Sequence, residues 1–381
     1  MVNSPQERLV IGVDAGGSKT KACLAIYRPD DPSRSPEPSK TACWTDAIRV
    51  IGNGETGPGN PRSVGFDTVY ENVKDAIGAS FQSAGIQPAT AHAICVCMAG
   101  VGQADQRIPV AQWIEKSNLA HRVRVSEDVT PIRWAALWET RHLYNPSLLV
   151  ESKQLWNNSV TLISGTGSIV SATKEPTLAE SGVIALTKST LAQTDPQPLV
   201  EISLQTTRVG GWGYLLGDEG SGFAIGLSAL KEVCRAHDCG EDFSPLHRAV
   251  LRELGCECAI DLIPRIYTQP IPRPKIASLY QTVVQFASSD LIASKLLEYA
   301  SADLAELIVA GATRIGLQSG KYGLAFSGGT LLGKSPLVPT ILRHLEQMQM
   351  SPALSHQVND PVLGAVVMAC LLQANPKSRV D

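Results

Sequence analysis

The chain has 381 residues, of which 44% are hydrophobic and 18% are charged, and this predicts a globular protein of about two domains. The formal net charge of −3 argues against nucleic-acid or membrane partners, since both need a basic surface. Met1–Glu7 is polar, no run approaches the roughly 20 apolar residues of a membrane span, and the nine cysteines are scattered, so we expect a cytoplasmic protein with reduced thiols.

The first predicted feature is a β-hairpin. Leu9–Asp14 and Lys21–Tyr27 are short apolar runs on either side of a Gly-rich turn. Only glycine lets backbone N–H groups approach an anionic phosphate in such a turn, and Asp14 ends the first strand, where a carboxylate can hold Mg²⁺ directly or through water. The turn therefore suggests a phosphate loop, although an ordinary polar turn is the alternative for this loop taken alone.

The next segments predict loops, a helix and a buried strand. Arg28–Ser39 is rich in Pro, Ser and Asp and should be a surface loop, and we expect Gly52–Arg62 to be too irregular for regular structure. Phe66–Ala84 places its apolar residues on one helical face. Ala93–Met98 is a buried-strand run that ends at Ala99-Gly100. A short helix over Val110–Ser117 and a strand over Arg122–Val125 lead to Ser126-Glu127-Asp128.

A second cycle then repeats the first pattern. Val160–Ser164 and Ile169–Ala172 are strand-like runs that flank Gly165-Thr166-Gly167-Ser168. Strand, Gly-rich turn and strand occur twice in the same order, so we predict an internal duplication with two phosphate loops. Neither loop matches a Walker A sequence, a protein-kinase Gly loop or a dinucleotide-binding fingerprint.

The remaining sequence alternates strands and helices, which predicts an α/β fold. Glu175–Thr207 is rich in Pro and Thr and reads as an inserted surface excursion. The other segments are a Gly-dense stretch at Gly210–Gly222, helices at Phe223–Ala236, Ser288–Gly316 and Val362–Gln373, and a strand at Tyr322–Phe326 that runs into Ser327–Thr330.

Four stretches together resemble the actin, hexokinase and heat-shock-chaperone ATPase superfamily, and within it the N-acetylglucosamine kinases and BadF-like ATPases. They are Val13–Thr20, Ile163–Ser168, Gly210–Gly222 and Ser327–Thr330. The resemblance implies a two-domain actin-like (ribonuclease H-like) α/β fold with an interdomain nucleotide and sugar cleft. It further implies an N-terminal domain over residues 1–131, a C-terminal domain over 132–360, and a last helix, within 361–381, that packs back on the first domain.

The resemblance also implies roles for individual residues. Asp128 would be the catalytic base, and Asp14 would hold Mg²⁺. ATP would be bound by Gly16, Gly17, Ser18, Lys19, Gly165, Thr166, Gly167, Gly328 and Gly329. The sugar would be bound by Asn60, Asp128, Thr166, Gly211, Trp212 and Asp218.

Several of these residues have a structural alternative. Phosphoryl transfer needs a carboxylate that accepts the hydroxyl proton, and Asp128 at a strand end suits that role better than Glu127, which should face the other way. Asp128 is also a reasonable N-cap for a helix over Thr130–Trp138. Asn60 and Asp218 fit turn positions, and Trp212 either stacks on a ligand or packs in a core.

The implied function is phosphorylation of N-acetyl-D-glucosamine at its 6-hydroxyl, with ATP and Mg²⁺. A kinase for glucosamine, N-acetylmuramic acid or N-acetylmannosamine is the alternative within the same class. For an activator ATPase with an iron–sulfur cluster, the only local candidate ligands are Cys256 and Cys258, and the scattered cysteines disfavour this function. A sensor without turnover would not need both Asp14 and Asp128. The expected partners are a sugar and ATP, neither nucleic acid nor membrane, and a homodimer is compatible with the sequence.

Overall fold

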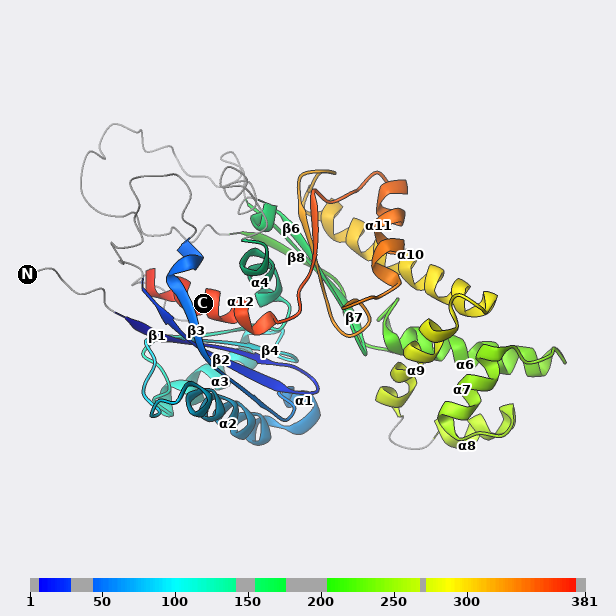
Figure 1. The fold of residues 1–381 in the computed structure, drawn as a ribbon, viewed down its shortest axis with the longest axis horizontal. Helices are drawn as coiled ribbons and strands as arrows, with labels where there is room; N and C mark the ends of the chain where they lie inside the picture. The colour runs from blue at the N-terminus through cyan, green and yellow to red at the C-terminus, as the bar shows by residue number, and fades with distance from the viewer. Residues whose placement is uncertain (1–6, 29–43, 142–154, 176–203, 268–271, 375–381) are drawn as a thin grey trace, which may run out of the picture. The chain divides into compact units, whose positions relative to one another are not determined.

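The computed structural model describes residues 7–28, 44–141, 155–175, 204–267 and 272–374 (Figure 1). The chain divides into two compact units. Unit 1 comprises Met1–Asn157, Glu175–Leu204 and Asp360–Asp381, and unit 2 comprises Asn158–Lys174 and Gln205–Asn359. Each unit is built around one five-stranded sheet. None of the described helices is long and apolar enough to cross a membrane.

The sheet of unit 1 has the strand order β3-β2-β1-β4-β5. Its strands are β1 (Arg8–Ala15), β2 (Thr20–Tyr27), β3 (Ile48–Thr56), β4 (Ala93–Met98) and β5 (Val123–Glu127). β1, β2 and β3 form an antiparallel meander, whereas β4 pairs parallel with β1, and β5 pairs parallel with β4. The predicted hairpin and the predicted buried strand are therefore both confirmed.

Helices cover this sheet in two layers, each with its own apolar core. One core packs α2 (Phe66–Ala84) and α3 (Ala104–Lys116) against the strands. The other packs α12 (Pro361–Ala374) with α4 (Thr130–Thr140). Shorter helical segments of the unit include η2 (Trp44–Ala47) and α1 (Pro61–Val64).

The prediction of an irregular loop over Gly52–Arg62 is wrong for its first half, because β3 continues to Thr56. Gly52 and Gly54 are required in β3 because helix α2 packs directly on the strand at these two positions. A Cβ on Gly52 would lie 2.1 Å from the carbonyl oxygen of Ser80, and one on Gly54 would lie 2.0 Å from that of Ala76, both in α2. Glycine here marks close helix–strand packing, which in sequence looks like turn chemistry.

The sheet of unit 2 repeats the pairing scheme of unit 1. Its order is β10-β9-β6-β7-β8, with β6–β7–β8 antiparallel and β9 and β10 added in parallel beyond β6. The strands are β6 (Ser159–Ser164), β7 (Ser168–Lys174), β8 (Gln205–Gly210), β9 (Gly323–Ser327) and β10 (Leu354–Gln357). The internal duplication predicted from the two Gly-rich turns is confirmed by this common topology.

The other segments were predicted with mixed success. Gln205–Thr207, expected to end a surface excursion, is the first half of β8, while residues 176–203 lie outside the described residues, as do residues 29–43. The predicted helices are confirmed as α6 (Gly222–Asp238) and α10 (Leu291–Arg314). The helices not anticipated are α7 (Pro245–Leu254), η3 (Ala259–Asp261), α8 (Leu262–Ile266), α9 (Arg273–Phe286) and α11 (Leu337–Gln347).

The C-terminal helix belongs to unit 1, although its sequence follows the whole of unit 2. Gly364 of α12 is so close to α4 that a Cβ on it would lie 1.9 Å from the carbonyl oxygen of Pro131. A Cβ on Gly12 of β1 would lie 2.4 Å from the backbone nitrogen of Val366. Unit 1 also continues past Pro131 to Asn157, so the boundary expected after residue 131 stays a prediction.

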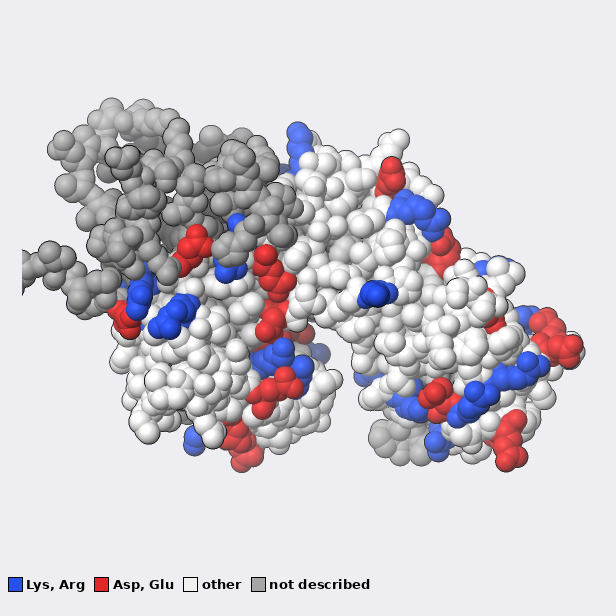
Figure 2. All heavy atoms as spheres, viewed as in Figure 1, with Lys and Arg blue, Asp and Glu red and all other residues white. Residues whose placement is uncertain are grey.

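Charged side chains are spread over both units. On the face drawn in Figure 2, Lys and Arg as well as Asp and Glu side chains occur over the described residues of both units.

Candidate functional site

The first of the two predicted phosphate loops is the turn between β1 and β2. The backbone N–H of Gly16 donates to the carbonyl oxygen of Lys19 at 2.9 Å, which closes the turn. Gly17, Ser18 and Lys19 are exposed, so their backbone and the serine hydroxyl are accessible to a ligand. The ammonium group of Lys19 lies 3.2 Å from Oε2 of Glu55, a residue of β3 that the sequence did not single out.

Two carboxylates act on a third, Asp14, near the end of β1 in the unit 1 sheet. Asp14, the next to last residue of β1, is half-buried. Burial raises the pKa of the Asp14 carboxyl to about 7, with further increases from the negative charges of Asp128 and Asp360, while Lys21 and Lys19 oppose the shift. Asp14 and Asp128 are therefore brought together, and Asp360, which precedes Pro361 at the start of α12, joins them although sequence reasoning missed it.

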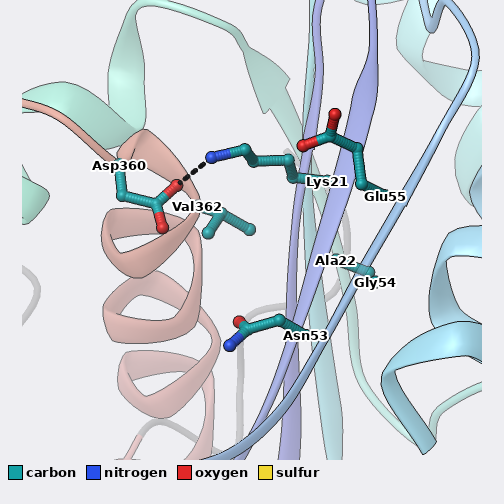
Figure 3. Close-up of a pocket in the computed structure, with 7 residues that line it drawn as sticks. All are labelled: Lys21, Ala22, Asn53, Gly54, Glu55, Asp360 and Val362. Carbon is teal, nitrogen blue, oxygen red and sulfur yellow. Dashed lines mark hydrogen bonds and ion pairs between the residues drawn. The ribbon is translucent and has the colours of Figure 1, made fainter. Parts of the chain in front are cut away.

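Lys21 connects this carboxylate group to the C-terminal helix. Its ammonium group lies 3.0 Å from Oδ1 of Asp360, and Figure 3 shows it reaching from β2 to the first turn of α12. In the strand register Lys21 is opposite Asp14 on β1 and opposite Glu55 on β3. The pair borders a cavity of about 320 Å³ lined by Lys21, Ala22, Asn53, Gly54, Glu55, Asp360 and Val362.

These carboxylates could bind Mg²⁺ only together with oxygen ligands from a phosphate group. The described residues contain no group of three or more His, Cys, Asp or Glu side chains arranged to hold a metal alone. Mg²⁺ is commonly bound through one or two carboxylates, substrate phosphates and water. A half-buried Asp14 with a raised pKa is a group that a cation would stabilise, so the residues present fit a magnesium–nucleotide complex.

The two neighbouring acids after β5 have different surroundings. Glu127 ends the strand and lies 3.8 Å from Nη1 of Arg107. Asp128 follows it, and its charge acts on Asp14. Helix α4 begins at Thr130 with Val129 as its N-cap, and no side chain caps it. The alternative of Asp128 as the helix N-cap is therefore not what the structure shows.

Asn60 lies beside the first phosphate loop. The N–H of Gly59 donates to the carbonyl oxygen of Gly16 at 2.8 Å, which ties the two loops together. Oδ1 of Asn60 accepts from the backbone N–H of Arg62 at 3.0 Å and caps α1. The turn role considered for Asn60 is thus real, and it fixes the amide next to Gly100 at the end of β4.

The second phosphate loop joins β6 to β7 in unit 2. The N–H of Gly165 donates to the carbonyl oxygen of Gly167 at 2.9 Å, as in the first loop, and Thr166 is exposed at the tip. The carbonyl oxygen of Gly165 accepts from the N–H of Gly222 at 2.8 Å. The loop is therefore bonded to the start of α6.

Three Gly-rich segments that are far apart in sequence meet at Ser164, the last residue of β6. Oγ1 and N–H of Thr330 donate to the carbonyl oxygen of Ser164 at 2.9 and 3.2 Å. The hydroxyl of Ser164 donates to the carbonyl oxygen of Gly220 at 3.2 Å. Gly328 has φ +96°, and a Cβ on it would lie 2.2 Å from the Ser164 carbonyl oxygen. The backbone crossing at this point therefore requires glycine.

Asp218 packs directly against the second phosphate loop. Its side chain is buried, its φ is +64°, and Oδ1 accepts from the N–H of Ser168 at 3.4 Å. Burial raises the pKa of Asp218, and the Ser168 hydrogen bond and the charge of Arg273 counteract the rise. A Cβ on Gly167 would lie 2.7 Å from Oδ2 of Asp218, so glycine makes room for this carboxylate.

Trp212 stands out from unit 2. Its side chain is 73% exposed, and those of Leu215 and Leu216 are each 78% exposed. The core-packing interpretation of Trp212 is therefore wrong. Gly211 before it has φ +67° and its carbonyl oxygen accepts from Nη2 of Arg208 at 2.6 Å, which anchors the loop while the aromatic ring stays accessible.

The predicted residues are divided between the two units. Unit 1 holds Asp14, Gly16, Gly17, Ser18, Lys19, Asn60 and Asp128, and unit 2 holds Gly165, Thr166, Gly167, Gly211, Trp212, Asp218, Gly328 and Gly329. The residues that sequence reasoning missed are Lys21, Glu55 and Asp360. The Asp-Pro step at Asp360-Pro361 is a helix-start signal that could have drawn attention to the last of them.

Comparison with known proteins confirms the resemblance inferred from the motifs. The BadF/BadG/BcrA/BcrD ATPase family model matches residues 11–180. The chain is 24% identical over 364 residues to the N-acetylmuramic acid/N-acetylglucosamine kinase of Clostridium acetobutylicum, covering 95% of this chain and 98% of that protein. It is 23% identical over 370 residues to the N-acetyl-D-glucosamine kinase of Dictyostelium discoideum, with the same two coverages of 95% and 98%.

The fold is also shared with a solved structure. A candidate N-acetylglucosamine kinase from Chromobacterium violaceum matches with a TM-score of 0.63 and 24% identity, over 96% of this chain and 99% of that chain. Together with the repeated sheet topology, this confirms the predicted class: an α/β fold of the two-domain actin-like ATPase type.

Proposed function

We propose that this chain is an ATP-dependent sugar kinase that transfers the γ-phosphoryl group to the 6-hydroxyl of N-acetyl-D-glucosamine. The proposal is supported by full-length similarity to curated amino-sugar kinases. The observation that carries it in the geometry is the electrostatic coupling between Asp14 and Asp128 in unit 1. One carboxylate for a magnesium–nucleotide complex and a second for the acceptor hydroxyl are what phosphoryl transfer requires.

The proposed chemistry divides between these two acids. Asp128 would accept the proton of the attacking hydroxyl late in the transfer, and Asp14 would hold Mg²⁺ bound with the nucleotide. Bound Mg²⁺ would neutralise charge on the phosphate oxygens. Ser18, Lys19 and the backbone of Gly16 and Gly17 contact the β- and γ-phosphates. The ammonium group of Lys19, which lies 3.2 Å from Glu55, would bind phosphate instead. Breaking this ion pair costs little free energy because both side chains are exposed.

The nucleotide contacts of unit 2 rest on backbone rather than on side chains. Gly165, Thr166 and Gly167 form a turn with exposed Thr166 at its tip. We assign them to phosphate and assign Gly328 and Gly329 to adenosine. A Cβ on Gly329 would have no atom within 4 Å, so its backbone is open on the side where a ligand would approach.

The sugar would be bound by Asn60 and Asp128 of unit 1 and by Thr166, Gly211, Trp212 and Asp218 of unit 2. A carboxylate accepts from two hydroxyls at once, which suits Asp218. An exposed indole ring such as that of Trp212 offers an apolar face to the C–H groups of a pyranose ring. These assignments follow the family resemblance, with the packing of Asp218 on the second loop as additional support.

The test is an ADP-release assay with ATP and Mg²⁺, with and without N-acetylglucosamine, followed by NMR of the sugar product. The proposal expects sugar-dependent ADP release and a phosphate on O6. Phosphate on another hydroxyl would support the sugar kinase activity but contradict the assignment of the 6-hydroxyl as the acceptor. ADP release that no sugar stimulates, together with bound iron, would favour the activator ATPase and overturn the proposal.

A further inference from the structure

We infer that Arg273 is a positioning residue for the Gly-dense segment Gly210–Gly222, an inference that rests on the proposed kinase activity. Arg273 is the first residue of α9, a helix that was not predicted from the sequence, and no motif gives it a role. Its guanidinium group contacts this segment between Trp212 and Asp218, two of the side chains proposed to bind the sugar.

The start of α9 is fixed within unit 2 by close packing on α6 (Figure 1). A Cβ on Gly226 of α6 would lie 2.0 Å from the carbonyl oxygen of Ile276, three residues after Arg273. At the start of α6, the N–H of Gly222 donates to the carbonyl oxygen of Gly165 at 2.8 Å. Arg273 therefore belongs to a pair of helices that also holds the second predicted phosphate loop.

The guanidinium group of Arg273 lies over an aromatic ring of the Gly-dense segment. Its central carbon is 4.2 Å from the ring centroid of Tyr214 and 6.0 Å from that of Phe223. The two rings pack edge to face with their centroids 5.3 Å apart, and Phe223 is buried. An aromatic face attracts a cation more strongly when both are partly removed from water, as the half-buried Arg273 and Tyr214 are. The contact therefore fixes Tyr214, two residues after Trp212.

The positive charge of Arg273 also acts on the carboxylate of Asp218. Burial raises the pKa of Asp218 and the charge of Glu219 adds to the rise, whereas the charge of Arg273 and a backbone hydrogen bond from Gly213 lower it. Because Gly213 precedes Tyr214, Asp218 and Arg273 hold the same turn from two sides. An ionised carboxylate accepts hydrogen bonds from sugar hydroxyls, so Arg273 favours the form of Asp218 that the proposed sugar site needs.

The test measures kcat and KM for N-acetylglucosamine and for ATP between about pH 5 and 8 in the wild type, Arg273→Met and Arg273→Lys. We expect Arg273→Met to lower kcat/KM for the sugar roughly three- to thirtyfold, mainly through KM, with KM for ATP unchanged. The acid limb of its kcat/KM profile should move to higher pH, because Asp218 loses a charge that lowers its pKa. Arg273→Lys keeps the charge without the planar group, so it should keep the wild-type acid limb and recover part of the affinity.

Two further variants separate the aromatic contact from general effects. Lys275→Met is the matched control, since Lys275 is an exposed cation of the same helix that lies 3.5 Å from Glu253, and it should leave both KM values unchanged. Tyr214→Leu removes the aromatic face. Its effect on KM for the sugar should therefore not add to that of Arg273→Met when the two are combined. If Arg273→Met does not fold, Arg273→Lys and Tyr214→Leu test the same contact.

Other results would overturn the inference in distinguishable ways. A wild-type KM for the sugar and an unchanged acid limb in Arg273→Met remove it and leave the proposed function intact. An equal rise of KM for the sugar and for ATP assigns Arg273 to the general stability of unit 2. Additive losses in the double variant remove the contact with Tyr214 as the cause. A wild type that phosphorylates no amino sugar removes the proposed function and the inference together.

Discussion

At the scale of single residues, the proposed chemistry depends on two acids of unit 1. Asp14 is half-buried and destabilised by the charges of Asp128 and Asp360, so it gains most from a bound cation. Asp128 lies beyond the end of β5, while its neighbour Glu127 pairs with Arg107. The proposed base is Asp128, because its negative charge acts on Asp14 near the end of β1.

Asp128→Asn keeps the size and the hydrogen-bonding capacity of the side chain and removes its ability to accept a proton. We expect kcat to fall on the order of 10²–10⁴-fold, with sugar affinity retained. Glu127→Gln is the matched control and should lose far less activity. Steady-state kinetics and isothermal titration with the sugar check both variants. Near-normal turnover by Asp128→Asn with an inactive Glu127→Gln would mean that the other acid is the base.

Asp14 should make stability depend on pH. The pKa of its carboxyl is about 7 in the folded chain, against an ordinary value of 3.8. Because the folded state holds this proton more tightly than the unfolded state, the contribution of Asp14 is most favourable below about pH 4. It becomes less favourable as the pH rises towards 7. Asp14→Asn removes the ionisation, so the metal-free variant should exceed the wild type in stability at pH 8 by about 1–3 kcal/mol.

Urea unfolding of both proteins at pH 4, 6 and 8, without Mg²⁺, measures this difference. It should be small at pH 4 and largest at pH 8. Mg²⁺ with a nucleotide at pH 8 should then stabilise the wild type more than Asp14→Asn. A stability difference that is the same at all three pH values would contradict the role given to burial and to the neighbouring carboxylates.

At the scale of elements, the sequence predicted correctly those helices and strands whose apolar residues repeat with a regular local spacing. Phe66–Ala84 is α2 with the predicted bounds, and Ala93–Met98 is β4 with the predicted bounds. β3 was missed because its glycines are dictated by α2, and a contact between distant segments leaves no local signal. The candidate site follows the same rule. Its Gly-rich loops can be recognised from the local sequence. Asp360 and Glu55 cannot, because they reach Lys21 and Lys19 only through the folding of the sheet and the C-terminal helix.

Two adjacent glycines separate the structural and the ligand-binding roles of the loop after β9. Gly328→Ala places a Cβ 2.2 Å from the Ser164 carbonyl oxygen at φ +96°, so it should destabilise the protein by about 1–3 kcal/mol. Gly329→Ala meets no atom within 4 Å and should leave stability unchanged. If adenosine lies on this backbone, Gly329→Ala should raise KM for ATP. Thermal unfolding and ATP kinetics give the two readouts, and an unchanged KM would remove the adenosine assignment.

At the scale of the whole molecule, one sheet topology occurs twice and the chain returns to unit 1 at its end. The duplication gives each unit a Gly-rich turn between its two central antiparallel strands. The return of α12 completes the second core of unit 1. It also brings Asp360 to Lys21, at the carboxylate group.

The close packing of α12 makes a direct prediction about stability. Gly364→Val has no room, because even a Cβ would lie 1.9 Å from the carbonyl oxygen of Pro131. We expect a loss of about 1–3 kcal/mol or more. Gly78→Ala, at an exposed site of α2 with no atom within 4 Å, should instead stabilise by about 0.5–1 kcal/mol. Equal stabilities for the two variants would contradict the docking of α12 on α4.

The proposal as a whole is tested most directly by kcat/KM for N-acetylglucosamine, glucosamine and glucose measured side by side with ATP and Mg²⁺. A site built for a 2-acetamido group leaves buried polar groups unpaired with the other two sugars, at about 1–3 kcal/mol per group. At about 1.4 kcal/mol per tenfold, we predict a preference of roughly tens- to hundredfold for the acetylated sugar. Equal values for the three sugars, or a preference for glucose, would contradict the account.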